Sequence, residues 1–130
     1  MTTLSAVGVA PQYDLSCDQG YDLDFAVTIQ DQTTGLPVNL TGYTVEMVVK
    51  AGFAETAALI TAATNIAAAS YITLNGALGK ATIHLDHADT ALLAAPRSMV
   101  YDLRYKSPGN AQVRYLWGTF YVKPQVTPIV

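Results

Sequence analysis

Two histidines and two aspartates lie close together in the chain and have the side chains best suited to metal chemistry. His84, Asp86, His87 and Asp89 fall within one short segment and offer imidazole nitrogens and carboxylate oxygens, which are ligand atoms for divalent metals. Their spacing matches no recognised metal-binding motif, and a helix entry with solvated polar groups explains the same residues. The sequence therefore predicts no metal site and no other cofactor.

Residue types that catalysis requires are present, but not in a catalytic pattern. Asp18, Asp22 and Asp24 lack the residue order and the terminal Glu of an EF-hand calcium loop, and they fit the wet face of a strand. The chain contains no Gly-x-Ser-x-Gly elbow and no glycine-rich phosphate loop. Cys17 is the single cysteine, so we expect a buried thiol and no intrachain disulfide. We predict that the protein is not an enzyme; a hydrolase built on two facing acids is the third-ranked alternative.

Length and composition bound the fold and the partners. A chain of 130 residues with 51% hydrophobic and 13% charged residues forms one domain with a packed core rather than a disordered segment. The formal charge is −3 and the pI is near 5.0, so the basic excess that phosphate binding requires is absent. Nucleic acid is therefore excluded as an expected partner.

The charge is distributed unevenly along the chain. Residues 1–49 contain six acids and no Lys or Arg, whereas residues 97–130 contain five basic residues and one acid. One interpretation is that acidic and basic strands meet as cross-strand pairs within one fold. The other is that they form complementary patches on neighbouring subunits, and both can hold together.

Neither targeting nor membrane insertion is expected. The first basic residue is Lys50, so the basic region that opens a secretory signal is missing. The uncharged stretch 56–79 is long enough to span a bilayer but contains four Thr, two Asn, a Ser and two Gly. We expect no membrane partner.

Hydrophobic periodicity predicts strands and little helix. The alternating segments are 13–17, 21–29, 43–50, 71–74, 81–85, 99–106 and 112–123. A short helix over 88–95, capped by Asp86 or Asp89 and ended by Pro96, is also expected, while 51–70 is ambiguous. The domain is predicted to span 13–123, between an extended arm at 1–12 and a tail at 124–130.

This pattern predicts an all-β protein, an antiparallel β-sandwich of immunoglobulin-like or jelly-roll-like order. Aromatic residues gather on the last two strands, where Tyr115, Trp117 and Tyr121 are expected to share a face with Val113. Because Tyr and Trp serve equally in a core, a sugar-stacking platform or an interface, we expect Trp117 in the core and keep the other two readings open.

Several segments resemble small virion modules of tailed bacteriophages. Val38–Val45 is similar to a "pro-val-asp-leu-thr-gly-tyr" segment of that group, and Val100–Leu103 to its "tyr-asp-leu" strand. Arg114–Thr127 is similar to the closing strand, and the hairpin strand Gly79–Leu85 with Thr90–Leu93 also fits. The resemblance covers roughly residues 13–127 and implies the β-sandwich of the N-terminal domain of upper baseplate and tail-fibre-associated proteins. The matching residues belong to scaffold and turns, so no binding residue is carried over.

The resemblance implies a non-enzymatic virion structural protein, assembled in the host cytoplasm. It would be a tail, baseplate, fibre-adaptor or capsid-decoration component that binds other virion proteins and itself, with a trimer expected by analogy. A carbohydrate-binding or host-adhesion module is the alternative. The expected interface residues are Arg104, Lys106, Arg114, Asp22, Asp24, Pro11 and Pro124.

Overall fold

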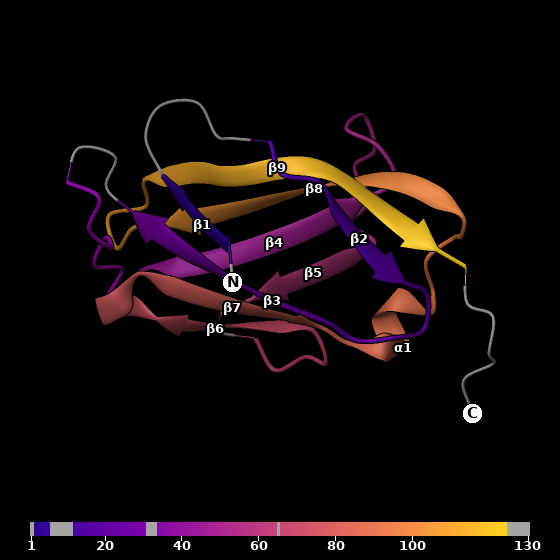
Figure 1. The fold of residues 1–130 in the computed structure, drawn as a ribbon, viewed down its shortest axis with the longest axis horizontal. Helices are drawn as coiled ribbons and strands as arrows, with labels where there is room; N and C mark the ends of the chain where they lie inside the picture. The colour runs from indigo at the N-terminus through magenta and orange to yellow at the C-terminus, as the bar shows by residue number, and fades with distance from the viewer. Residues whose placement is uncertain (1, 6–11, 31–33, 65, 125–130) are drawn as a thin grey trace.

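The computed structural model describes residues 2–5, 12–30, 34–64 and 66–124, of which 2–5 are described by their backbone, and it contains two β-sheets packed face to face (Figure 1). Sheet A has the strand order β1-β3-β7-β6 and sheet B the order β2-β9-β8-β4-β5. The strands are β1 (Thr2–Ser5), β2 (Leu15–Asp18), β3 (Leu23–Gln30), β4 (Thr44–Lys50), β5 (Ile60–Ala63), β6 (Tyr71–Asn75), β7 (Lys80–Leu85), β8 (Arg97–Lys106) and β9 (Gln112–Lys123). The predicted all-β sandwich is confirmed.

The core lies between the two sheets and follows the period-two alternation of the strands. In β4 and β8 every second side chain is buried; Met47 and Val49 of β4 lie beside Leu103 and Tyr101 of β8 on the inner face of sheet B. Sheet A contributes the matching inward residues from β3 and β7. Because alternate residues point to opposite faces, each strand also presents an outer face, and these outer faces are the surfaces available for binding.

A β-bulge in β9 changes which aromatic side chains enter the core. Leu103 pairs with Leu116, but Arg104 pairs with Arg114, so Tyr115 is an extra residue in the strand. Tyr115 and Leu116 are therefore both buried, and the alternation beyond them is reversed. The prediction that Tyr115 and Trp117 share a face is wrong, and so is a core position for Trp117, which is half-buried on the outer face of sheet B.

Both sheets gain an edge strand from the N-terminal part of the chain, in parallel rather than antiparallel pairing. β1 pairs with β3, and β2 pairs with β9. Residues 2–5, predicted to lie in the arm at 1–12, form β1 and add to sheet A of their own chain. Gly118 allows the backbone at Tyr13 to lie close to β9, because a Cβ at residue 118 would be only 2.4 Å from the carbonyl oxygen of Tyr13.

The helix α1 (His87–Thr90) is shorter than the predicted span of 88–95. Asp86 caps it as expected, accepting a hydrogen bond from the backbone of Ala88 at 3.0 Å. It ends early because Leu93 turns into the core and its carbonyl accepts a hydrogen bond from the Gln19 side chain at 2.8 Å. A 3-10 turn, η1 (Gly76–Leu78), lies between β6 and β7. No described helix has the length and apolar character that crossing a membrane requires.

Candidate interaction surfaces

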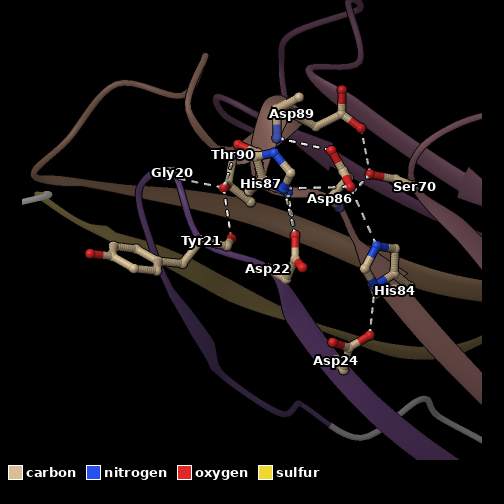
Figure 2. A network of polar contacts seen from close by, with 11 residues as sticks. Gly20, Tyr21, Asp22, Asp24, Ser70, His84, Asp86, His87, Asp89 and Thr90 are labelled. Carbon is tan, nitrogen blue, oxygen red and sulfur yellow. Dashed lines mark hydrogen bonds and ion pairs between the residues drawn. The ribbon is translucent and has the colours of Figure 1, made fainter. Parts of the chain in front are cut away.

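A network of polar side chains joins α1 to the start of β3 and to the strands β6 and β7 (Figure 2). We call it the α1 network. Its members come from segments far apart in the sequence but close together at one end of the sandwich: Asp22, Asp24, Ser70, His84, Asp86, His87, Asp89 and Thr90.

Several of these side chains bind backbone groups and so fix the chain path at this end. The Asp22 carboxylate accepts a hydrogen bond from the His87 backbone N–H at 2.7 Å. The Thr90 hydroxyl donates to the Tyr21 carbonyl at 2.8 Å and accepts from the Gly20 N–H at 3.1 Å. Thr90 is fully buried, so these two bonds replace the water that would otherwise bind the turn between β2 and β3.

The histidines lie between carboxylates. His84 Nδ1 is 2.7 Å from Asp24 Oδ1, and its Nε2 is 3.6 Å from Asp86 Oδ1. The hydrogen bond with Asp24 raises the pKa of His84, because it favours the protonated ring. The backbone N–H of His87 lowers the pKa of Asp22, because it stabilises the carboxylate. Both effects favour the charged forms, a protonated His84 and an ionised Asp22.

Three members of the network have the ligand types of a metal site. One ligand atom each from Asp22, Asp86 and His87 lie within 4.8 Å of one another. All three side chains already have protein partners, since Asp22 binds His87 twice and Asp86 caps α1. Of the four residues weighed from the sequence, Asp89 is directed away from this group and accepts a hydrogen bond from Ser70. A capped helix entry also explains these residues from the sequence, and the structure has this cap at Asp86.

The outer face of sheet B carries a different set of side chains. Phe53, from the connection between β4 and β5, packs edge-on against Trp117 with ring centroids 6.0 Å apart. Beside this pair lies a hollow of about 210 Å³, which we call the sheet B hollow. Its lining combines apolar and charged residues: Val48, Lys50, Phe53, Val100, Tyr101, Asp102, Arg104 and Arg114.

Two arginines on this face are paired with acids. Arg104 forms an ion pair with Glu46 on the neighbouring strand β4, and Arg114 Nε lies 3.4 Å from Asp102 Oδ2. The pair between Glu46 and Arg104 joins the acidic first part of the chain to its basic last part. Cross-strand pairing, the first interpretation of the uneven charge, is thus present at this position.

The residues predicted to form an interface separate onto two surfaces. Asp22 and Asp24 belong to the α1 network, whereas Arg104, Lys106 and Arg114 are exposed on the outer face of sheet B. Pro124 is exposed directly after β9. Pro11 lies outside the described residues.

Two residues that the sequence reasoning did not single out are prominent on these surfaces. Phe53 is 62% exposed and shields Trp117, and Leu92, just after α1, is 84% exposed. Phe53 lies in 51–70, the segment whose secondary structure the hydrophobic periodicity did not determine, so no sequence pattern indicated its position on the surface. Leu92 was expected in a helix, where a Leu normally points to the core.

Cys17 does not supply a reactive thiol. It is buried, as predicted, and burial raises the pKa of its thiol to about 11. A protonated, inaccessible thiol is a poor nucleophile and a poor metal ligand. The residue belongs to the core.

Comparison with protein-family models and with curated protein sequences gives no match. Among solved structures, the N-terminal domain of phage TP901-1 ORF48 has a similar fold, with a TM-score of 0.54. The match covers 93% of this chain and 94% of that domain at 12% sequence identity. The likeness therefore establishes a common fold, one used by a phage protein, and transfers no individual side chain.

Proposed function

We propose that this protein is a non-enzymatic structural component of a phage virion that acts through protein–protein contacts. The observation that carries the proposal is the fold shared with the N-terminal domain of phage TP901-1 ORF48 over almost the whole of both chains. The sequence segments that resemble tailed-phage virion modules support the same role. The finer assignment is a tail, baseplate, fibre-adaptor or capsid-decoration component, assembled in the host cytoplasm.

The surfaces support binding of proteins better than catalysis. The acids and histidines of the α1 network bind backbone groups and each other, and Cys17 is buried. A role in assembly uses surfaces of this kind, with an aromatic centre and a charged rim, as on the outer face of sheet B. The partners are other virion proteins and further copies of this chain, with a trimer as the first expectation.

Particle composition tests this proposal. Virions of the phage that encodes the chain are purified by density gradient, analysed by mass spectrometry, and labelled with antibody and gold for electron microscopy. We expect the protein in the particles at a fixed copy number, with gold at one structure such as the tail end or the head. Recovery from the lysate but not from purified particles would overturn the proposal.

A carbohydrate-binding module is a second candidate, favoured by the position of Trp117. Its ring lies on the outer face of sheet B beside the hollow, together with Phe53, and aromatic rings of this kind stack on sugars. Titration with polysaccharides of the host cell wall, followed by Trp117 fluorescence, tests it. A saturable change that is lost in Trp117→Ala would support this candidate, and its absence across the series would remove it.

A further inference from the structure

The turn that follows α1 exposes an apolar side chain among acids. Leu92 is the most exposed large hydrophobic residue of the described part, at 84%. Its backbone N–H bonds to the carbonyl of Asp89, which fixes it directly beside the α1 network. The network contributes four carboxylates to this end of the sandwich: Asp22, Asp24, Asp86 and Asp89. The result is an exposed apolar side chain that follows α1 directly, next to a surface on which four carboxylates outnumber the two histidines His84 and His87.

The sheet B hollow has the opposite properties. Val48, Val100 and Phe53 supply apolar walls, and the charged lining consists of three cations, Lys50, Arg104 and Arg114, against the carboxylate of Asp102. Cavities of about 150 Å³ bind a benzene-sized ligand, so a hollow of about 210 Å³ has room for a leucine side chain. Glu46 pairs with Arg104 and Asp102 pairs with Arg114, so the hollow is a recess with apolar walls and one excess positive charge, that of Lys50.

These two surfaces cannot meet within one molecule. Leu92 is not among the residues that line the hollow, and its exposure shows that it does not enter the hollow of its own chain. The helix α1 lies at one end of the sandwich (Figure 1), and its network joins β3 and β7 of sheet A. The hollow is lined by residues of sheet B and of the connection after β4. Protrusion and recess are complementary only between two copies.

We propose that Leu92 of one copy inserts into the sheet B hollow of a second copy, with the carboxylates of the α1 network facing Lys50, Arg104 and Arg114. The inference rests on the proposed assembly role and specifies its self-contact. Because protrusion and recess are different surfaces, the contact is heterologous, and repetition of it gives a closed ring or an open chain. A two-fold dimer would instead require each surface to meet itself.

Substitution of Leu92 tests the contact. In Leu92→Ser we expect self-association, measured by sedimentation equilibrium, to weaken about 10- to 100-fold, which is the effect of leaving a leucine unburied. Leu36→Ser is the matched control, since Leu36 is 64% exposed in the connection between β3 and β4 and should leave association unchanged. Unchanged association in Leu92→Ser, or equal weakening in both variants, would overturn the proposal.

Mixed disulfide formation tests the geometry independently. Leu92→Cys and Val48→Cys are prepared as separate proteins and oxidised alone and together, and Cys17 does not interfere because it is buried. We expect a disulfide-linked dimer in the mixture and none in either protein alone. A dimer of Leu92→Cys with itself would show a two-fold contact and contradict the proposal.

The failure of this inference differs from the failure of the proposed function. A wild-type protein that stays monomeric at all concentrations but is found in purified virions would remove the self-contact and leave the virion role intact. A protein that self-associates as described but is missing from virions would remove the virion role instead.

Discussion

The α1 network and the sheet B hollow differ in the groups that their polar side chains bind. In the α1 network the side chains of Asp22, Asp86 and Thr90 bind backbone groups. Around the hollow, Arg104 and Arg114 bind the side chains of Glu46 and Asp102 across the outer face. Polar groups that satisfy a buried backbone stabilise the fold strongly, whereas exposed ion pairs contribute little and remain available to a partner.

The largest effect on stability is therefore expected at Thr90. Thr90→Val keeps the shape of the side chain but removes the hydroxyl that binds the Tyr21 carbonyl and the Gly20 N–H. Removing the partner of the buried Gly20 N–H and of the part-buried Tyr21 carbonyl should lower the free energy of unfolding by about 2–4 kcal/mol, measured by urea denaturation. Thr82→Val on the exposed face of β7 is the control and should change it by less than about 0.5 kcal/mol. Similar losses in both variants would show that the α1 network does not stabilise the fold in this way.

A smaller effect is expected when the aromatic cover of sheet B is removed. Phe53→Ala deletes the edge-on contact with Trp117 and should lower the free energy of unfolding by about 1 kcal/mol. It should also increase quenching of Trp117 fluorescence by acrylamide, since the indole loses its shield. Leu59→Ala, which changes an exposed residue of the same connection, should leave the quenching unchanged. If Phe53→Ala also left it unchanged, the described packing of Phe53 on Trp117 would be incorrect.

The ion pair between Arg104 and Glu46 should matter less again for folding. Arg104→Ala is expected to lower the free energy of unfolding by about 0.2–1 kcal/mol, because both side chains are partly exposed. Self-association of the same variant should weaken clearly. Arg104 on sheet B would then contribute to association, whereas Thr90 in the α1 network contributes to stability. Arg97→Ala, at the exposed start of β8, serves as the control for general loss of charge. Equal association of the two variants would argue against a role for Arg104 in the contact.

The smallest effect is a pH dependence of stability that originates at His84. Asp24 raises the pKa of His84 above its ordinary value of 6.5, and Asp86, Asp22 and the ring of Tyr71 also face it. The protonated ring therefore stabilises the fold below about pH 6.5, and this contribution is lost as the pH rises through the raised pKa. Because Asp24 is exposed, we expect a loss of about 0.5 kcal/mol between pH 5.5 and 8.5 in urea denaturation.

The variant His84→Gln should remove this slope. A wild-type slope that persists in His84→Gln would assign the pH dependence to another group. A separate loss of stability is expected from Asp22 at lower pH. Its pKa is lowered in the folded protein, so the ionised carboxylate stabilises the fold above pH 3.8, the ordinary pKa of an aspartate. This contribution is lost as the pH falls through the lowered pKa.

The strands were predictable where one face is buried and the alternation is uninterrupted. In β4 and β7 the apolar residues occupy every second position, so burial follows directly from the sequence. In β9 the alternation is broken by the bulge at Tyr115, which depends on pairing with β8 and leaves no local signal. One inserted residue was enough to move Trp117 from the expected core to the surface.

The two surfaces were less predictable, because they join distant parts of the chain. Asp24 and His84 are neighbours because β3 and β7 pair with these two residues opposite each other. Asp22 contacts His87 because α1 follows β7 and lies beside the start of β3. The acids and basic residues were recognised by type, but their separation onto different surfaces follows from topology. Leu92 and Phe53 lie in connections, where a single apolar residue gives no periodic pattern.

Sedimentation velocity of the wild-type protein at low and high salt tests whether the α1 network and the sheet B hollow join copies of the chain. We expect oligomers at about 50 mM salt that dissociate at about 1 M salt, because screening weakens attraction between the α1 network and the cations of sheet B. We also expect that Leu92→Ser stays monomeric where the wild type associates. A wild type that is monomeric at both salt concentrations, up to high protein concentration, would contradict self-assembly through these surfaces.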